Sequence, residues 1–209
     1  MTSPFTGLHW TTDNKKMVEL EAIGFPLPAG DTCPGAGSCK ENCYATQGRY
    51  VMDNVAAPRA MNLVIVLKLL RRGPVNLATM LKKDLDLVTQ DVVRIHDSGD
   101  FFNQDYLDAW ILAISWTPEK KFYCYTKSHH LDWSKTPRNL AVIHSLGSKF
   151  DDLVDCSRPH ARVFRDLAEL LGYGYTDGSG SDRVALVGTI KVGLIYHGTR
   201  RAADNGFLA

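Results

Sequence analysis

Short apolar segments alternate with longer amphipathic ones along most of this chain. The strand candidates, of which about six are expected to form, are residues 17–25, 91–96, 121–126, 140–144, 152–156, 184–187 and 192–196. Helices are expected at residues 58–72, 77–88, 103–117 and 159–171, with a short helical turn at 131–135. Because strands that alternate with helices build βα units, the pattern predicts an α/β fold with a parallel sheet.

The length of the chain restricts how such a sheet closes. A complete eight-unit barrel usually needs about 250 residues, and this chain has 209. We therefore expect an open, partial (βα)6 barrel that forms a single domain over residues 1–209, with irregular ends at about 1–16 and 199–209. In such folds the functional side chains lie on loops at the carboxyl ends of the strands.

The composition is that of an ordinary globular protein, with 44% hydrophobic and 22% charged residues. A formal net charge of +1 gives no argument for a nucleic acid or a membrane surface as partner. The chain shows neither a signal-peptide pattern nor an apolar run long enough to cross a bilayer. Five cysteines, an odd number, favour a reducing cytoplasm in which thiolates are kept for metal.

Three of these cysteines, Cys33, Cys39 and Cys43, fall within eleven residues. The spacers contain Pro, Gly and Ser residues, which favour tight turns that can direct several thiolates to one point. Such a set suits a soft metal or three corners of a [4Fe–4S] cluster. Zinc is the rival, although zinc sites usually combine two C-x2–4-C knuckles, or one knuckle and a His pair, and this chain has one triple run and no second CxxC. The remaining alternative is three unrelated thiols, or a disulfide with one spare thiol.

The other two cysteines receive different interpretations. Cys124 lies inside the expected strand 121–126 among aromatic residues, which indicates a small buried hydrophobic side chain. Cys156 is expected to end the strand 152–156, and this makes it the better candidate for a fourth metal ligand.

A polar turn, His96-Asp97-Ser98-Gly99-Asp100, follows the expected strand 91–96. One interpretation is a turn whose aspartate caps the next helix. The other is a ligand pocket in which the carboxylates supply negative charge, His96 serves as acid or base, and Gly99 permits a close approach to the backbone.

Lys127 comes directly after the expected strand 121–126. In a parallel sheet its side chain would reach the same edge as the 96–100 turn, so we include it in the predicted pocket.

Three motifs together resemble the bacteriophage family called gene product eighty-eight. They are Cys33…Cys39…Cys43-Tyr-Ala, then Arg94-Ile-His-Asp-Ser-Gly-Asp-Phe-Phe, and then Phe122-Tyr-Cys-Tyr-Thr-Lys-Ser. The resemblance covers roughly residues 20–150, and it implies a phage origin and hence the host cytoplasm.

The order strand, three-cysteine loop, helix, strand and Gly-plus-acid turn is also similar, more distantly, to radical SAM enzymes. This resemblance implies a [4Fe–4S] cluster whose open iron binds S-adenosylmethionine, with Ser98, Gly99 and Asp100 at the turn that holds its amino group. The chain departs from that pattern, because five and three residues separate its cysteines instead of three and two, and no Gly-Gly-Glu turn is present. The departures count against S-adenosylmethionine more than against the cluster.

The leading hypothesis is therefore a [4Fe–4S] protein that acts through cluster-dependent binding, redox chemistry or sensing. A radical SAM enzyme and a zinc-stabilised binding module are the two rivals. An iron left open would favour catalysis, whereas ligation by Cys156 would favour the other roles. The sequence names neither a small molecule nor a protein as the partner.

Overall fold

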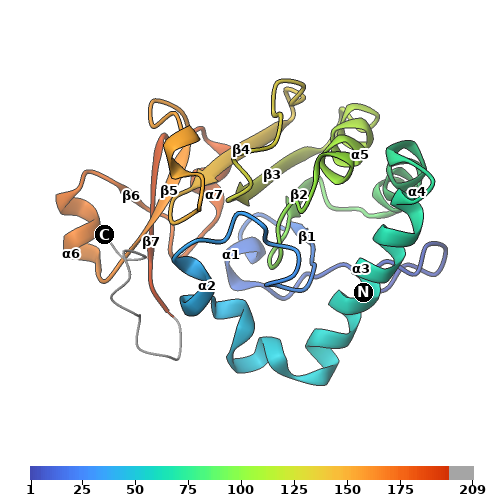
Figure 1. Ribbon diagram of the computed structural model, residues 1–209, viewed down its shortest axis with the longest axis horizontal. Helices are drawn as coiled ribbons and strands as arrows, with labels where there is room; N and C mark the ends of the chain where they lie inside the picture. The colour runs from blue at the N-terminus through green and yellow to red at the C-terminus, as the bar shows by residue number, and fades with distance from the viewer. Residues whose placement is uncertain (198–209) are drawn as a thin grey trace.

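A seven-stranded sheet, parallel throughout, organises the protein (Figure 1). The computed structural model describes residues 1–197, so the irregular end expected at 199–209 lies outside the described residues. The strand order is β1-β2-β3-β4-β5-β7-β6. The strands are β1 (Ile23–Phe25), β2 (Val92–Ile95), β3 (Lys121–Thr126), β4 (Leu140–Ser145), β5 (His160–Phe164), β6 (Thr176–Asp177) and β7 (Lys191–Ile195). The α/β class with a parallel sheet is confirmed.

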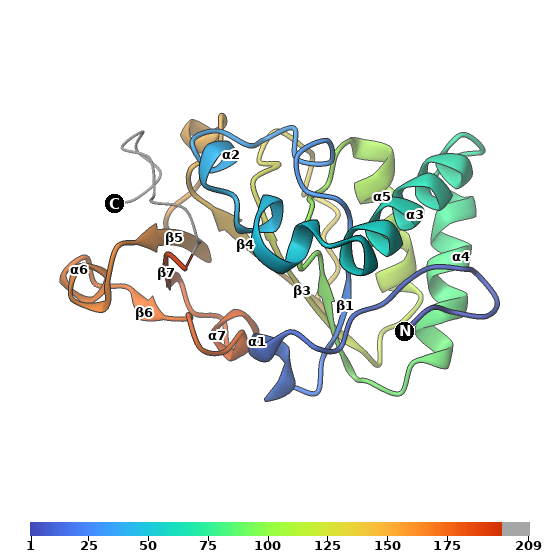
Figure 2. The same ribbon diagram turned by 90° about the horizontal axis from the view of Figure 1, so that it is seen from below.

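Three long helices cover one face of this sheet: α3 (Asp53–Leu70), α4 (Pro74–Leu87) and α5 (Gln104–Ser115). Figure 2 shows α4 and α5 together on one side, with the shorter α1 (Lys15–Val18) and α7 (Arg183–Leu186) apart from them. Leu77, Leu81 and Leu85 of α4 recur every four residues and are fully buried, as the spacing predicts. No helix of the described residues is long and apolar enough to span a membrane.

The remaining short helices lie in the connections. They are α2 (Cys39–Asn42), α6 (Leu167–Gly172) and the 3-10 turns η1 (Tyr44–Thr46), η2 (Gly48–Val51) and η3 (Asp151–Leu153). The helical turn expected at residues 131–135 is absent there, where the chain forms only hydrogen-bonded turns and bends.

Two strand predictions were wrong and a third was right only at its end, because short apolar runs do not distinguish a strand from a helix. Residues 184–187 belong to α7, and residues 152–156 begin in η3 instead of forming a strand. Residues 17–25 divide into α1, whose first turn is capped by the Asn14 side chain, and the shorter β1. The segment 1–16, which was expected to be irregular, therefore ends in the first two residues of helix α1.

The helix expected at residues 159–171 was wrong over its first half, which is strand β5. The regular spacing of Phe164, Leu167 and Leu171 suggested one helix across the whole segment. The helix starts only after Asp166, whose carboxylate accepts a hydrogen bond from the Glu169 N–H at 2.8 Å, a regular N-cap. Residues 176–177, between α6 and α7, form the two-residue strand β6.

The N-terminal segment is fixed to α4 through one buried carboxylate. Asp84 accepts hydrogen bonds from Ser3 Oγ (2.6 Å), Thr6 Oγ1 (2.7 Å) and Trp10 Nε1 (2.9 Å). The Trp10 ring in turn packs edge-on against Phe25 with their centroids 5.1 Å apart. Asp84 therefore connects the irregular N-terminal segment to the main core.

Replacing Asp84 by alanine should lower the free energy of unfolding by about 2–5 kcal/mol, because buried donors lose their acceptor. Urea denaturation followed by circular dichroism measures the change. Asp86→Ala is the matched control: Asp86 is exposed and pairs with Lys82 four residues earlier, a contact worth at most about 0.5 kcal/mol. Equal losses in the two variants would contradict this role for Asp84.

Candidate functional site

The three-cysteine loop joins β1 to α3 and ends in short helical turns. Cys39 is the first residue of α2 and Cys43 is its C-terminal cap. Because residues four apart lie on the same side of a helical turn, this arrangement puts the two thiols on one side of the loop. Cys33 lies between two hydrogen-bonded turns before α2, and all three side chains are partly buried.

Two glycines let this loop lie directly against the carboxyl ends of β3 and β4. A Cβ at Gly35 would be 2.1 Å from the Lys127 carbonyl oxygen, and one at Gly37 would be 2.8 Å from the Ser148 carbonyl carbon. Gly35 O accepts hydrogen bonds from Lys149 N at 3.0 Å and from Ser148 Oγ at 2.8 Å. No residue with a side chain fits at either glycine unless the backbone moves.

The three thiols influence one another electrostatically. Burial raises the pKa of Cys33 to about 12, with further rises caused by the charges of Asp100 and Cys43. Burial also raises the pKa values of Cys39 and Cys43; the Cys43 charge raises that of Cys39, and the Lys127 ammonium lowers both. The loop cysteines are therefore neighbours held as neutral thiols.

In this conformation the thiols are not drawn together as metal ligands. Within residues 1–197, no group of three or more His, Cys, Asp or Glu side chains is placed to hold a metal ion. The other two cysteines lie elsewhere: Cys124 is fully buried inside β3, as predicted, and Cys156 is exposed in the connection before β5. The structure therefore leaves Cys156 outside the loop. The charge of Cys156 acts on the pKa of Tyr175 instead.

The turn after β2 is fixed by a buried arginine from α3. Arg59 Nη2 lies 3.0 Å from Asp97 Oδ2, and Arg59 Nε donates to Ser98 Oγ at 2.9 Å. Ser98 Oγ in turn donates to the Leu27 carbonyl at 2.7 Å. Gly99 has φ +82°, and a Cβ there would lie 2.6 Å from that of Leu27, so this position requires glycine.

Asp100 connects the β2 turn to the end of β3. Its carboxylate accepts hydrogen bonds from Phe101 N (2.8 Å), Thr126 Oγ1 (2.7 Å) and Lys127 N (2.8 Å). Burial raises its pKa to about 6, and these hydrogen bonds oppose the rise. The charge of Asp100 also acts on Cys33 and Cys39, which places the carboxylate beside the cysteine loop.

Lys127 completes this edge of the sheet. Its ammonium group donates to the Ser145 carbonyl and hydroxyl oxygens, both at 3.2 Å, and to the Leu146 carbonyl. Burial lowers the pKa of Lys127, while the nearby charges of Cys39, Asp151, Asp100 and Cys33 raise it. Asp100, Lys127 and the loop thiols therefore form one cluster at the carboxyl edge, where the sequence predicted a pocket.

His96, in contrast, points away from this cluster and into the helix layer. Its Nε2 lies 2.8 Å from the Tyr106 hydroxyl of α5, and its ring packs edge-on against Phe101. The residue adopts φ +68°, and its Nδ1 has no hydrogen-bond partner among the described atoms. Burial, followed by the charge of Arg94, lowers the pKa of His96 to about 3, so the ring is neutral at physiological pH.

The sequence reasoning missed a second buried ion pair on the opposite face of the sheet. Arg94 Nη1 lies 2.7 Å from Asp182 Oδ2, which also accepts a hydrogen bond from Tyr123 at 3.0 Å. Tyr44, directly after Cys43, donates to the Asp97 carbonyl and so connects the loop to the β2 turn. The Arg94–Asp182 ion pair could have been expected from the sequence, because Arg94 lies inside the apolar run 92–95 and a buried charge requires a partner.

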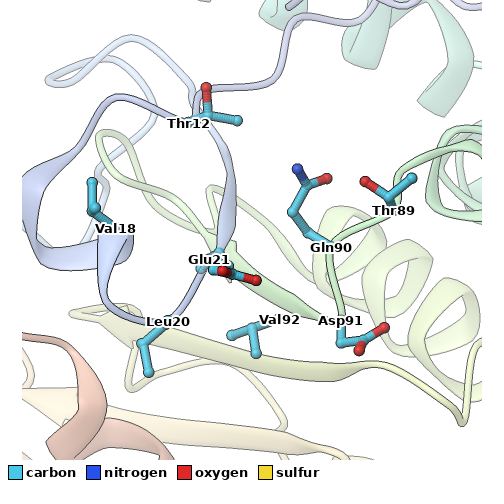
Figure 3. A pocket seen from close by; sticks show the side chains of 9 residues that line it. Thr12, Val18, Leu20, Glu21, Thr89, Gln90, Asp91 and Val92 are labelled. Carbon is cyan, nitrogen blue, oxygen red and sulfur yellow. The ribbon is translucent and has the colours of Figure 1, made fainter.

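A pocket of about 560 Å3 lies at the amino ends of β1 and β2, away from the cysteine loop. Figure 3 shows the lining side chains, with Thr12, Val18 and Leu20 from the chain before β1 and Thr89, Gln90 and Asp91 from the chain before β2. None of the predicted site residues lines it. The candidate site is therefore the cysteine edge, and not this pocket.

These features define an α/β protein with a three-cysteine loop at the carboxyl edge of a parallel sheet. The model of the family described as Gene product 88 matches residues 6–206 of the chain. The chain belongs to this family, which confirms the resemblance drawn from the motifs. No curated protein and no solved structure matches the chain.

The neutral state of His96 makes a pH-dependent contribution to stability. Its pKa is lower in the folded protein than in the unfolded chain, so the unfolded chain binds the extra proton and stability falls as the pH drops from about 6.5 to about 3. His96→Asn removes this titration, and asparagine tolerates the positive φ.

Over that pH range, we expect wild type to lose up to about 1.4 kcal/mol more per pH unit than His96→Asn. Urea denaturation at a series of pH values measures the two slopes. The lost Tyr106 hydrogen bond should shift the variant's curve downward without changing its slope. If the two curves are parallel, the pKa of His96 is the same in the folded and unfolded states, and this would contradict a ring held neutral by burial.

Proposed function

We propose that the three-cysteine loop holds a [4Fe–4S] cluster and that the protein acts through cluster-dependent binding, redox chemistry or sensing. The observation that carries the proposal is the shared location of Cys33, Cys39 and Cys43 at the carboxyl edge of the sheet, where the Cys43 charge acts on the other two thiols. Three thiolates supplied by one loop suit three corners of such a cluster.

The donor set fits a cluster in its chemistry, and the loop must close further to bind one. Binding requires thiolates, whereas burial keeps these groups protonated, so uptake releases protons and weakens as the pH falls. The buried Lys127 ammonium lies in the field of Cys39 and Cys33 and would offset the negative charge of the thiolates.

The stagger of the strands supports the partial-barrel architecture that the radical SAM resemblance implies. Ile95, the last residue of β2, pairs with Cys124, whereas β3 continues to Thr126. Ser145, the last residue of β4, pairs with Ala161, whereas β5 continues to Phe164. Both displacements run in the direction that the shear of a barrel requires, whereas β1 and β2, and likewise β5 and β7, end level with each other.

An enzyme of the radical SAM kind is the second candidate, and the exposed position of Cys156 favours it. With Cys156 outside the loop, the three thiols would leave one iron of a cluster without a protein thiolate. The resemblance implies that S-adenosylmethionine binds at such an iron. The Asp100 charge raises the pKa values of Cys33 and Cys39, so this carboxylate is close enough to the loop to pair with an ammonium group there.

A zinc-stabilised binding module is the third candidate, and the next experiment distinguishes it from an iron–sulfur protein. Structural zinc takes four ligands, and the loop supplies three. Iron and sulfide content distinguishes the two metals directly.

Anaerobically reconstituted protein should contain about four irons and about four sulfides per chain. Replacing Cys33, Cys39 or Cys43 by serine should remove most of the iron and lower the melting temperature of the loaded protein, since metal binding and folding are coupled. Iron, zinc and acid-labile sulfide are measured on each variant.

Cys124→Ser is the matched control, because Cys124 is buried in β3 and belongs to no predicted metal site. It should keep its iron and lose only stability, on the order of 1–3 kcal/mol. Zinc in place of iron, or loss of iron in Cys124→Ser but not in Cys33→Ser, would contradict the proposal.

Cys156 separates the enzyme from the other cluster-dependent roles. Because this side chain is exposed and apart from the loop, Cys156→Ala should keep the iron content and absorbance of wild type. Adding S-adenosylmethionine to the reduced protein should then change its electron paramagnetic resonance spectrum. Loss of iron in Cys156→Ala, with a wild-type spectrum that ignores S-adenosylmethionine, would instead make Cys156 the fourth ligand and count against the enzyme.

A further inference from the structure

The outer face of α3 carries apolar side chains that the fold leaves exposed. Met61, Val64 and Leu67 are 55%, 60% and 42% exposed, although they lie within an 18-residue helix. The opposite face is buried through Arg59, Asn62 and Val66. The exposed face of this helix is thus apolar, although its buried face carries two polar residues, and an isolated monomer does not require such an exposed face.

The exposed residues form one continuous stripe. Ala57 and Ala60 extend it towards the start of the helix, and both are exposed. Asp53 stands at one end and Arg71, directly after the helix, at the other. Because the 18 positions that separate them make about five turns, the two charges lie on the same side as the apolar residues.

The two halves of the stripe complement each other in size. Its first half carries the small residues Ala57 and Ala60, and its second half carries Val64 and Leu67. Val64, Leu67, Lys68 and Arg71 surround a shallow hollow of about 390 Å3. These four residues have the i, i+3, i+4, i+7 spacing of a hole that receives a side chain from a facing helix.

We propose that this stripe is a homodimer interface, in which α3 packs antiparallel against α3 of a second copy about a two-fold axis that crosses the exposed stripe midway between Ala60 and Val64. About that axis Ala57 faces Leu67, Ala60 faces Val64, and Asp53 faces Arg71 of the partner copy. Each small residue meets a large one, and each acid meets a base. A two-fold interface must be self-complementary in this way.

The electrostatics favour the antiparallel orientation. The Asp53 and Arg71 side chains are exposed and form no ion pair within the described residues, so both are available to a partner. An antiparallel pair also brings the positive end of each helix dipole near the negative end of the other. A parallel pair would set Asp53 against Asp53 and Arg71 against Arg71.

The interface lies apart from the cysteine edge and does not depend on the proposed cluster. In Figure 1, α3 runs along the periphery of the molecule, and the sheet lies on its inner side. A dimer of this kind leaves the loop at Cys39 and the ends of β3 and β4 uncovered by the α3 stripe.

Sedimentation equilibrium over a concentration series tests the proposal. Wild type should approach twice the chain mass of 23.2 kDa at the higher concentrations. Val64→Glu should sediment as a single chain while keeping the wild-type circular dichroism spectrum, since Val64 contributes little to the monomer core. Val75→Glu is the matched control, because Val75 is 57% exposed on α4, outside the stripe, and should leave the dimer intact.

A charge exchange tests the orientation. Asp53→Arg and Arg71→Asp should each weaken the dimer by about tenfold or more, because each replaces two attractive pairs by two repulsive ones. The double variant should recover the wild-type dissociation constant. A wild type that stays monomeric, a dimer that survives Val64→Glu, or a double variant no tighter than the single ones would overturn the proposal.

Discussion

The Asp100 carboxylate joins the neighbouring strands β2 and β3 at the edge where the candidate site lies. By accepting hydrogen bonds from Phe101 N, Thr126 Oγ1 and Lys127 N, it fixes the turn after β2 against the end of β3. The cysteine loop then rests on the same strand end, because Gly35 lies against the Lys127 carbonyl. The parallel strands bring the thiols, Lys127 and the 96–100 turn to one edge, and the Asp100 hydrogen bonds fix the turn there. The carboxylate is buried, which is why its pKa rises to about 6.

Buried charges are arranged as pairs on both faces of the sheet. Arg59 pairs with Asp97 between α3 and the β2 turn, and Arg94 pairs with Asp182 between β2 and α7. Removing one member of such a pair is costly, since it leaves the other charge buried without compensation. The pairs also determine geometry: Arg59 orients Ser98 beside Leu27, and this orientation allows Gly99 to pass close to the β1 connection.

The parts of the fold that depend on local pattern were predictable from the sequence, and those that depend on distant partners were not. Strand 121–126 and the leucine face of α4 follow from apolar spacing alone, as does the placement of Lys127 at the carboxyl edge. The ion pair of Arg59 with Asp97 joins residues 38 positions apart, and no local pattern indicates it. The error at β5 had a different cause, because the side-chain spacing of Phe164, Leu167 and Leu171 is helical while the backbone changes from strand to helix at Asp166.

The central proposal is that Cys33, Cys39 and Cys43 hold a [4Fe–4S] cluster. Mössbauer spectroscopy of protein reconstituted anaerobically with 57Fe and sulfide tests it most directly, because it reports the type of cluster and the environment of each iron. The account predicts the spectrum of a four-iron cluster from the wild type and no such spectrum from Cys39→Ser. A protein that retains no iron, or that binds only mononuclear iron or zinc under the same conditions, would contradict it.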